Sequence, residues 1–147
     1  GTIPVSLFVV PELRSLHLVL TGLEGTLPPL VGNASFLEEL YVSQNSLSGI
    51  IPSELGDCLD LVELSLSDNA FSQPLPSSLG SLSKLRVLSL NRPFAFGEPS
   101  TPFPEWMCDL SSLEELLCYK SRLAGILPTC IGNLDRLKTL NLDLNQI

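Results

Sequence analysis

Apolar residues recur along the chain in a fixed pattern in which buried-type positions alternate with polar ones. In one segment the apolar positions are Leu37, Leu40, Val42 and Leu47, and Asn45 lies between the last two. The alternation with a period of two predicts a short strand with one buried face. The same template restarts at Leu13, Leu37, Leu61, Leu85, Leu113 and Leu137.

The spacing of these restarts indicates a repeat architecture. The starting leucines lie 24, 24, 24, 28 and 24 residues apart. A single short strand cannot bury its apolar face, so the repeats are expected to stack with their strands parallel. The expected strands lie near residues 15–19, 39–43, 63–67, 87–91, 115–119 and 139–143. Residues 1–12 match the second half of an earlier repeat, and we expect residues 1–147 to form a segment of one solenoid that begins and ends within a repeat.

Asparagine recurs where each predicted strand ends. An amide side chain can satisfy backbone groups that a turn leaves unpaired, so Asn45, Asn69 and Asn145 are predicted to form a structural ladder. Three repeats depart from this pattern, because they carry Thr21, Pro93 and Ser121 at the ladder position.

The repeat that starts at Leu85 carries four extra residues, in a stretch with four prolines and three phenylalanines. An insertion of this size in a solenoid most economically forms a loop on one face, here expected at about residues 93–103. Two interpretations stay open: a tolerated loop, or a specificity loop beside the binding surface.

The pattern LxxLxLxxNxLxGxIPxxLGxL resembles the plant-type leucine-rich repeat of receptor-like kinases, receptor-like proteins and polygalacturonase-inhibiting proteins, over essentially the whole chain. The resemblance implies an α/β solenoid, a curved right-handed stack. Its parallel sheet lies on the concave face, and 3₁₀ or irregular turns lie on the convex face.

The resemblance also implies a function. It points to a non-catalytic recognition module of a cell-surface receptor-like protein or kinase in signalling or defence. The expected partner is a protein or peptide on the concave face, with a glycan as a further ligand class and a co-receptor as a second partner. The alternatives are a secreted inhibitor of cell-wall-degrading enzymes and an intracellular scaffold.

Side chains that alternate with the buried leucines are expected to face outward as a grid on the concave face. Tyr41 and Tyr119 are its candidate aromatic anchors. The candidate ligand-binding residues are His17, Tyr41, Ser43, Ser65, Ser67, Asp68, Ser89, Asn91, Arg92, Tyr119, Lys120, Asn141 and Asp143.

Catalytic groupings are not predicted. His17 is the only histidine, and no nucleophile, phosphate-binding or zinc-protease motif occurs. The pairs Glu38–Glu39 and Glu114–Glu115 are neighbours along a strand, so they point to opposite faces and do not converge as a glycosidase requires. We therefore expect no enzyme activity, no metal site and no cofactor.

Four cysteines allow three pairings. Cys108 and Cys130 lie near corresponding convex positions of adjacent repeats and could form a disulfide. Cys118 replaces a strand leucine, so it is expected to be a buried free thiol, and Cys58 is also expected to be free.

The net charge is −8, and no run of Lys or Arg occurs. This balance argues against nucleic acid and anionic membranes as partners. No apolar stretch approaches the length of a membrane span. Asn33-Ala34-Ser35 is a glycosylation sequon on the expected convex side. We expect an extracellular or cell-surface location, attached to the plasma membrane through flanking segments, with the cytoplasm as the alternative.

Overall fold

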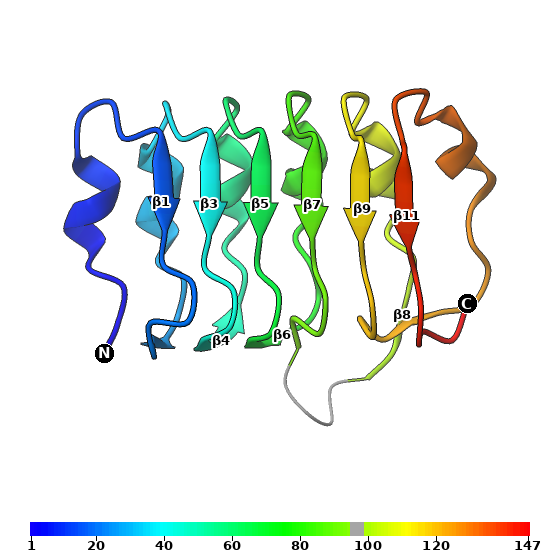
Figure 1. Cartoon of the computed structure of the whole chain (residues 1–147), viewed down its shortest axis with the longest axis horizontal. Coiled ribbons are helices and arrows are strands. Elements are labelled where there is room, and N and C mark those ends of the chain that lie inside the picture. Colours follow the sequence, from blue (N-terminus) through cyan, green and yellow to red (C-terminus); the bar gives the residue numbers. More distant parts are fainter. Residues whose placement is uncertain (95–98) are drawn as a thin grey trace.

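The computed structural model describes residues 1–94 and 99–147, and Figure 1 shows its repeats standing side by side along the long axis. Six strands form one parallel sheet in the order β1-β3-β5-β7-β9-β11. Their bounds are β1 Ser15–His17, β3 Glu39–Tyr41, β5 Glu63–Ser65, β7 Val87–Ser89, β9 Glu115–Leu117 and β11 Thr139–Asn141.

The register of the sheet places equivalent residues of successive repeats beside one another. Leu40 pairs with Leu16 on one side and with Leu64 on the other, and Leu88 and Leu116 continue the row. The predicted parallel sheet is therefore confirmed.

The regular strands are three residues long, shorter than the five predicted. A residue in left-handed backbone stands three positions after each strand, as Leu20 does after the end of β1 with φ 55°. Hydrogen bonds between repeats still continue past the strand, as from the Leu20 N–H to the Ser43 carbonyl at 3.1 Å.

Short 3₁₀ helices lie behind the sheet (Figure 1). Each follows a proline in extended backbone, as Pro52 at φ −67° and ψ 140° precedes one of them. A proline fixes φ and has no N–H to leave unpaired, so it suits this position. The short turns predicted for this side are confirmed. The helices are η1 Val5–Val9, η2 Pro29–Asn33, η3 Ser53–Asp57, η4 Ser77–Ser81, η5 Glu105–Asp109 and η6 Thr129–Asn133.

A second row of parallel strands runs below the main sheet and changes at the longest repeat. It consists of the three-stranded sheet β2-β4-β6 and the pair β8-β10. Between them, Phe71 and Phe94 form an isolated bridge. The loop expected at about 93–103 falls partly on residues 95–98, which lie outside the described residues. The bounds are β2 Glu24–Gly25, β4 Ser46–Ile50, β6 Ala70–Ser72, β8 Thr101–Pro102 and β10 Leu123–Ala124.

One apolar core fills the space between the main sheet and the 3₁₀ helices. Leu40, Leu64, Leu88 and Leu116 are each fully buried in it. Leu140 is 40% exposed, because β11 is an edge strand with a neighbour on one side only. Each strand therefore depends on its neighbours for burial of its apolar face.

The first prediction concerns the column of buried leucines that contains Leu40, Leu64, Leu88 and Leu116. Leu64→Ala should lower the free energy of unfolding by about 2–5 kcal/mol, because it leaves a cavity among well-packed leucines. Leu59→Ala is the matched control, since Leu59 is 55% exposed. Urea unfolding followed by circular dichroism measures both. Equal losses for the two variants would contradict the assigned burial.

Candidate functional site

The outward side chains of the six strands form a row on the open face of the main sheet. His17 pairs with Tyr41, and Tyr41 pairs with Ser65 in the sheet register. His17 is exposed, whereas Tyr41 and Ser65 are half-buried. We call this surface the sheet face. Its central row is His17, Tyr41, Ser65, Ser89, Leu117 and Asn141.

Two rings and two carboxylates form a cluster at the β1–β5 end of the sheet face. The His17 and Tyr41 rings meet edge to face, with their centroids 4.6 Å apart. His17 Nε2 lies 2.8 Å from Glu39 Oε2, and the Tyr41 hydroxyl donates to Glu63. The hydrogen bonds from His17 and Ser15 lower the pKa of Glu39. Sequence reasoning considered Glu39 only as one of two neighbouring carboxylates that do not converge, and it missed the contact with His17 because that contact joins neighbouring repeats.

Three serines proposed as ligand contacts are instead buried: Ser43, Ser67 and Ser89 are 8%, 6% and 9% exposed. The Ser67 and Ser89 hydroxyl oxygens are 2.8 Å apart, and those of Ser43 and Ser65 are 2.6 Å apart. This corrects the expectation that all of them face solvent. Small side chains in adjacent repeats approach closely enough to satisfy one another, so little of each remains for a ligand.

The residue just before each ladder position adopts left-handed backbone. The values of φ lie between 47° and 57°, a region that costs residues other than glycine about 1–2 kcal/mol each. In the first five repeats this N–H donates to a carbonyl of the next repeat, as from Gln44 to the Ser67 carbonyl at 3.0 Å and from Lys120 to the Asp143 carbonyl at 2.8 Å. We call this the left-handed column; its members are Leu20, Gln44, Asp68, Arg92, Lys120 and Leu144.

The C-terminal half of the left-handed column borders a hollow of about 320 Å³. Asp68, Arg92 and Lys120 occupy successive positions of the column. Arg92 forms an ion pair with Asp68 at 2.6 Å. Arg122 was not among the predicted site residues, although it lines this hollow. We call the hollow the basic pocket; it is lined by Arg92, Phe94, Ser100, Lys120, Arg122, Leu144, Asn145 and Gln146.

Of the remaining predicted contacts, Asn141 belongs to the central row, and Asn91, Tyr119 and Asp143 directly precede residues that line the basic pocket. The Asn91 Oδ1 accepts a hydrogen bond from the Tyr119 N–H at 2.8 Å, and the Tyr119 side chain is half-buried. Asn141 Oδ1 accepts from the Asp143 N–H at 3.0 Å, and Asp143 is exposed. Tyr119 and Asp143 therefore belong to the same end of the sheet face.

The asparagine side chains at the ends of the strands join neighbouring repeats. Asn45 Nδ2 donates to the Leu18 carbonyl at 2.7 Å and to the Val42 carbonyl at 2.9 Å. Asn45 Oδ1 accepts from the N–H groups of Thr21 and Leu23 at 3.1 and 3.0 Å. Asn69 and Asn145 make equivalent bonds.

Where serine or threonine replaces the ladder asparagine, the side chain makes fewer hydrogen bonds to the backbone. Ser121 is 2% exposed, and its hydroxyl donates to the Leu90 carbonyl of the preceding repeat. Thr21 is exposed, and its hydroxyl lies 3.0 Å from the Leu18 carbonyl of its own repeat and 3.2 Å from Asn45 Oδ1 of the next repeat. Neither hydroxyl matches the two donors and the acceptor of an amide.

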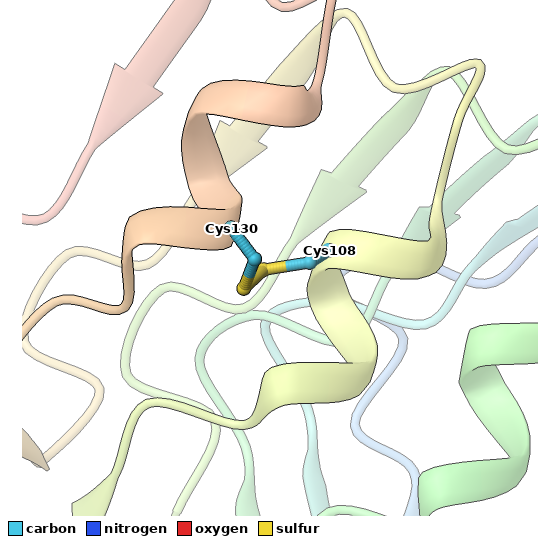
Figure 2. Close-up of a disulfide and its surroundings, with 2 residues drawn as sticks. All are labelled: Cys108 and Cys130. Carbon is cyan, nitrogen blue, oxygen red and sulfur yellow. A yellow bond between two sulfur atoms is a disulfide. The ribbon is translucent and has the colours of Figure 1, made fainter.

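On the opposite side of the molecule, Cys108 and Cys130 form a disulfide with a Cα–Cα distance of 5.8 Å (Figure 2). It joins η5 to η6. Cys58 and Cys118 are buried free thiols, and burial raises their pKa to about 11 and about 12. Because the thiolate is the reactive form, neither thiol suits nucleophilic chemistry.

The glutamate pairs considered as catalytic carboxylates bind cations of other repeats. Glu114 lies 2.8 Å from both Arg86 and Lys138, and these cations lower its pKa to about 2. Arg14 forms an ion pair with Glu38 in the same way. Asn33, the sequon residue, ends η2 and is exposed.

Comparisons with known proteins agree with this geometry. The family described as Leucine Rich Repeat matches residues 36–58 and 60–82. The chain has the fold of a leucine-rich-repeat solenoid, and its repeats resemble those of plant receptor ectodomains. No curated protein sequence matches it significantly.

Several solved structures resemble this leucine-rich-repeat chain. The ectodomain of the Arabidopsis thaliana receptor kinase GASSHO1/SCHENGEN3, in complex with CASPARIAN STRIP INTEGRITY FACTOR 2, is 35% identical with a TM-score of 0.89; the match covers 99% of this chain and 17% of that one. The Arabidopsis receptor kinase HAESA, with the peptide hormone IDA and the co-receptor SERK1, is 36% identical with a TM-score of 0.85, covering 99% and 24%.

A shorter relative is the ectodomain of the Arabidopsis thaliana receptor kinase SOBIR1, which is 28% identical with a TM-score of 0.76 and covers 88% of this chain and 69% of that one. This leucine-rich-repeat chain spans about a fifth of the length of the two longer ectodomains. In residues 1–94 and 99–147, no helix is long and apolar enough to cross a membrane.

The ladder gives a second prediction. Asn69→Asp should lower the free energy of unfolding by about 2–4 kcal/mol, because the carboxylate cannot donate to the Val42 and Leu66 carbonyls and places a negative charge beside these acceptors. Asn33→Asp is the control with the same chemical change at an exposed position. Chemical unfolding of both variants at neutral pH measures the difference, and similar losses would show that the ladder contributes little.

A third prediction tests the left-handed column at Gln44, which is exposed with φ 57°. Gln44→Val should lower the stability of the solenoid by about 1–2 kcal/mol, because a β-branched side chain clashes in this backbone region. Gln44→Gly removes the same amide side chain but tolerates positive φ, so it should be close to neutral. Thermal melting compares the two, and equal stability would contradict the assigned backbone.

Proposed function

We propose that this solenoid segment belongs to an extracellular receptor ectodomain and recognises a peptide or protein ligand across its sheet face. The observation that carries the proposal is the sheet face itself: Tyr41 stands in the central row, and Tyr119 stands beside the charged left-handed column, on a backbone fixed by neighbouring repeats. A rigid surface has little conformational entropy to lose when it binds.

The resemblance to receptor ectodomains supports this proposal. Two of them are described in complex with CASPARIAN STRIP INTEGRITY FACTOR 2 and with the peptide hormone IDA. A peptide is therefore the ligand class that we favour over a glycan. The HAESA complex also contains the co-receptor SERK1, and a co-receptor is a second partner that we propose for the full-length protein.

The Cys108–Cys130 disulfide supports an extracellular location. Disulfides persist in secreted and cell-surface proteins and are rare in the reducing cytosol, which disfavours the intracellular scaffold. The exposed Asn33 would carry a glycan at the end of η2, on the side away from the sheet face. Such a glycan would leave the proposed binding surface open.

The two tyrosines provide the test. Peptides selected from a randomised display library against the protein serve as ligands, and their dissociation constants are measured for the protein and its variants. Tyr41→Ala and Tyr119→Ala should each weaken binding by about 1–2 kcal/mol, as expected for aromatic anchors. Thermal melting checks that both variants stay folded.

Glu54→Ala is the control, because Glu54 is exposed on η3, behind the sheet. It should leave the dissociation constants unchanged. The proposal is wrong if both tyrosine variants bind as the unchanged protein does while Glu54→Ala abolishes binding.

A further inference from the structure

A second hollow, of about 350 Å³, lies on the N-terminal part of the solenoid. It is lined by residues 8–13 and 33–36, and we call it the turn cleft. The two segments lead from the ends of η1 and η2 into β1 and β3, along the upper edge of Figure 1. Phe8 is buried there, whereas Val9 and Val10 are 59% and 45% exposed. The turn cleft therefore exposes apolar side chains that the core does not cover.

Phe36, which also lines the turn cleft, departs from the pattern of the other repeats. It stands one position before the starting leucine of its repeat and is 47% exposed. The Arg14 guanidinium carbon lies 6.0 Å from the centroid of its ring. A contiguous exposed apolar surface indicates a site that another group covers. Polar or charged residues occupy the Phe36 position in every other repeat: Glu12, Asp60, Lys84, Ser112 and Arg136.

The glycosylation sequon lies in the same cleft. Asn33-Ala34-Ser35 is the only such sequon in the sequence, and all three of its residues line the turn cleft. Asn33 ends η2 and is exposed. Among the residues that the structure describes, the Asn33 side-chain amide has no hydrogen-bond partner, so its nitrogen is free to take a sugar. The acceptor nitrogen and the uncovered apolar surface therefore belong to one site.

We infer that Asn33 carries an N-linked glycan whose first sugar, an N-acetylglucosamine, packs into the turn cleft against Phe36. The inference rests on the extracellular location given under the proposed function, since this modification belongs to secreted proteins. In the reaction the Asn33 amide nitrogen forms a bond to the anomeric carbon of the sugar and loses one proton. The leaving group is the diphosphate of a lipid-linked oligosaccharide donor.

The size and the chemistry of the turn cleft suit a sugar ring. A hollow of about 350 Å³ lies at the lower end of the range for ligand pockets, so it accommodates a sugar ring and not a folded partner. The C–H groups on one face of the sugar carry partial positive charge and pack against the negative face of an aromatic ring. The covalent bond to Asn33 holds the sugar beside Phe36 at a high effective concentration.

The test compares three forms of the protein secreted by eukaryotic cells that make only high-mannose glycans. Ser35→Thr keeps the sequon, Ser35→Ala removes it, and endoglycosidase H trims the glycan of Ser35→Thr to one N-acetylglucosamine. Intact mass should show sugar on Ser35→Thr and none on Ser35→Ala. The glycosylated form should melt about 2–4 °C above Ser35→Ala, and the trimmed form should keep most of this gain. Both variants made in the bacterial periplasm, without the glycan, give the baseline for the substitution itself.

Phe36→Ser tests the packing, because serine occupies this position in another repeat as Ser112. The gain in melting temperature from the glycan should be lost in this variant, since the sugar then has no aromatic ring to cover. Leu59→Ser is the matched control. Leu59 is 55% exposed and lies in the turn of the next repeat, outside the turn cleft, so the gain should be unchanged.

An unmodified Asn33 would overturn the inference, and so would a glycan that brings no gain. A gain that vanishes on trimming, or that persists in Phe36→Ser, would overturn it as well, because the first sugar would then lie outside the cleft. These readouts are independent of ligand binding. Silent Tyr41 and Tyr119 variants with a packed glycan would remove the sheet-face proposal alone, and an unmodified Asn33 with tyrosine-dependent binding would do the reverse.

Discussion

Hydrogen bonds from one repeat to the next, at the point where each strand ends, are the interaction on which the rest of this structure depends. A three-residue strand is too short to fix its own position, and its N–H and C=O groups find partners only in the neighbouring repeats. The Asn45 side chain joins this network with both its donor and its acceptor atoms. Once these bonds set the register, the leucines fall into a continuous column and the outward side chains into a row.

The longest repeat shows what happens when this network is interrupted. Pro93 stands at the ladder position and has no amide side chain, and the second row of strands divides there into two sheets. The Cys108–Cys130 disulfide joins this repeat to the next from the opposite side. In other repeats a glycine occupies the Cys108 position, and a Cβ built on Gly56 would lie 2.4 Å from the Ser78 carbonyl oxygen. Close backbone contact in one pair of repeats is thus replaced by a covalent bond in another.

The sequence predicted the features that repeat and missed those that depend on two particular repeats. The leucine periodicity gave the parallel sheet and its register, because every repeat obeys the same rule. The burial of Ser67 and Ser89 was not predicted, since it follows from two small side chains happening to be neighbours. The basic pocket was also missed as a unit. Lys120 and Arg122 are two residues apart, but Arg92 and Phe94 join them only through the fold.

The left-handed column shows how a strained position can serve recognition. Its backbone is fixed by hydrogen bonds between repeats, so the backbone conformation depends little on which residue stands there. The same position accordingly holds apolar Leu20, acidic Asp68 and basic Lys120 without a change in backbone. The side chain at this position can vary because the backbone conformation stays the same. If the sheet face binds a ligand as we propose, a change in ligand preference needs substitutions along this column and the central row only, while the leucine core and the asparagine ladder remain as they are.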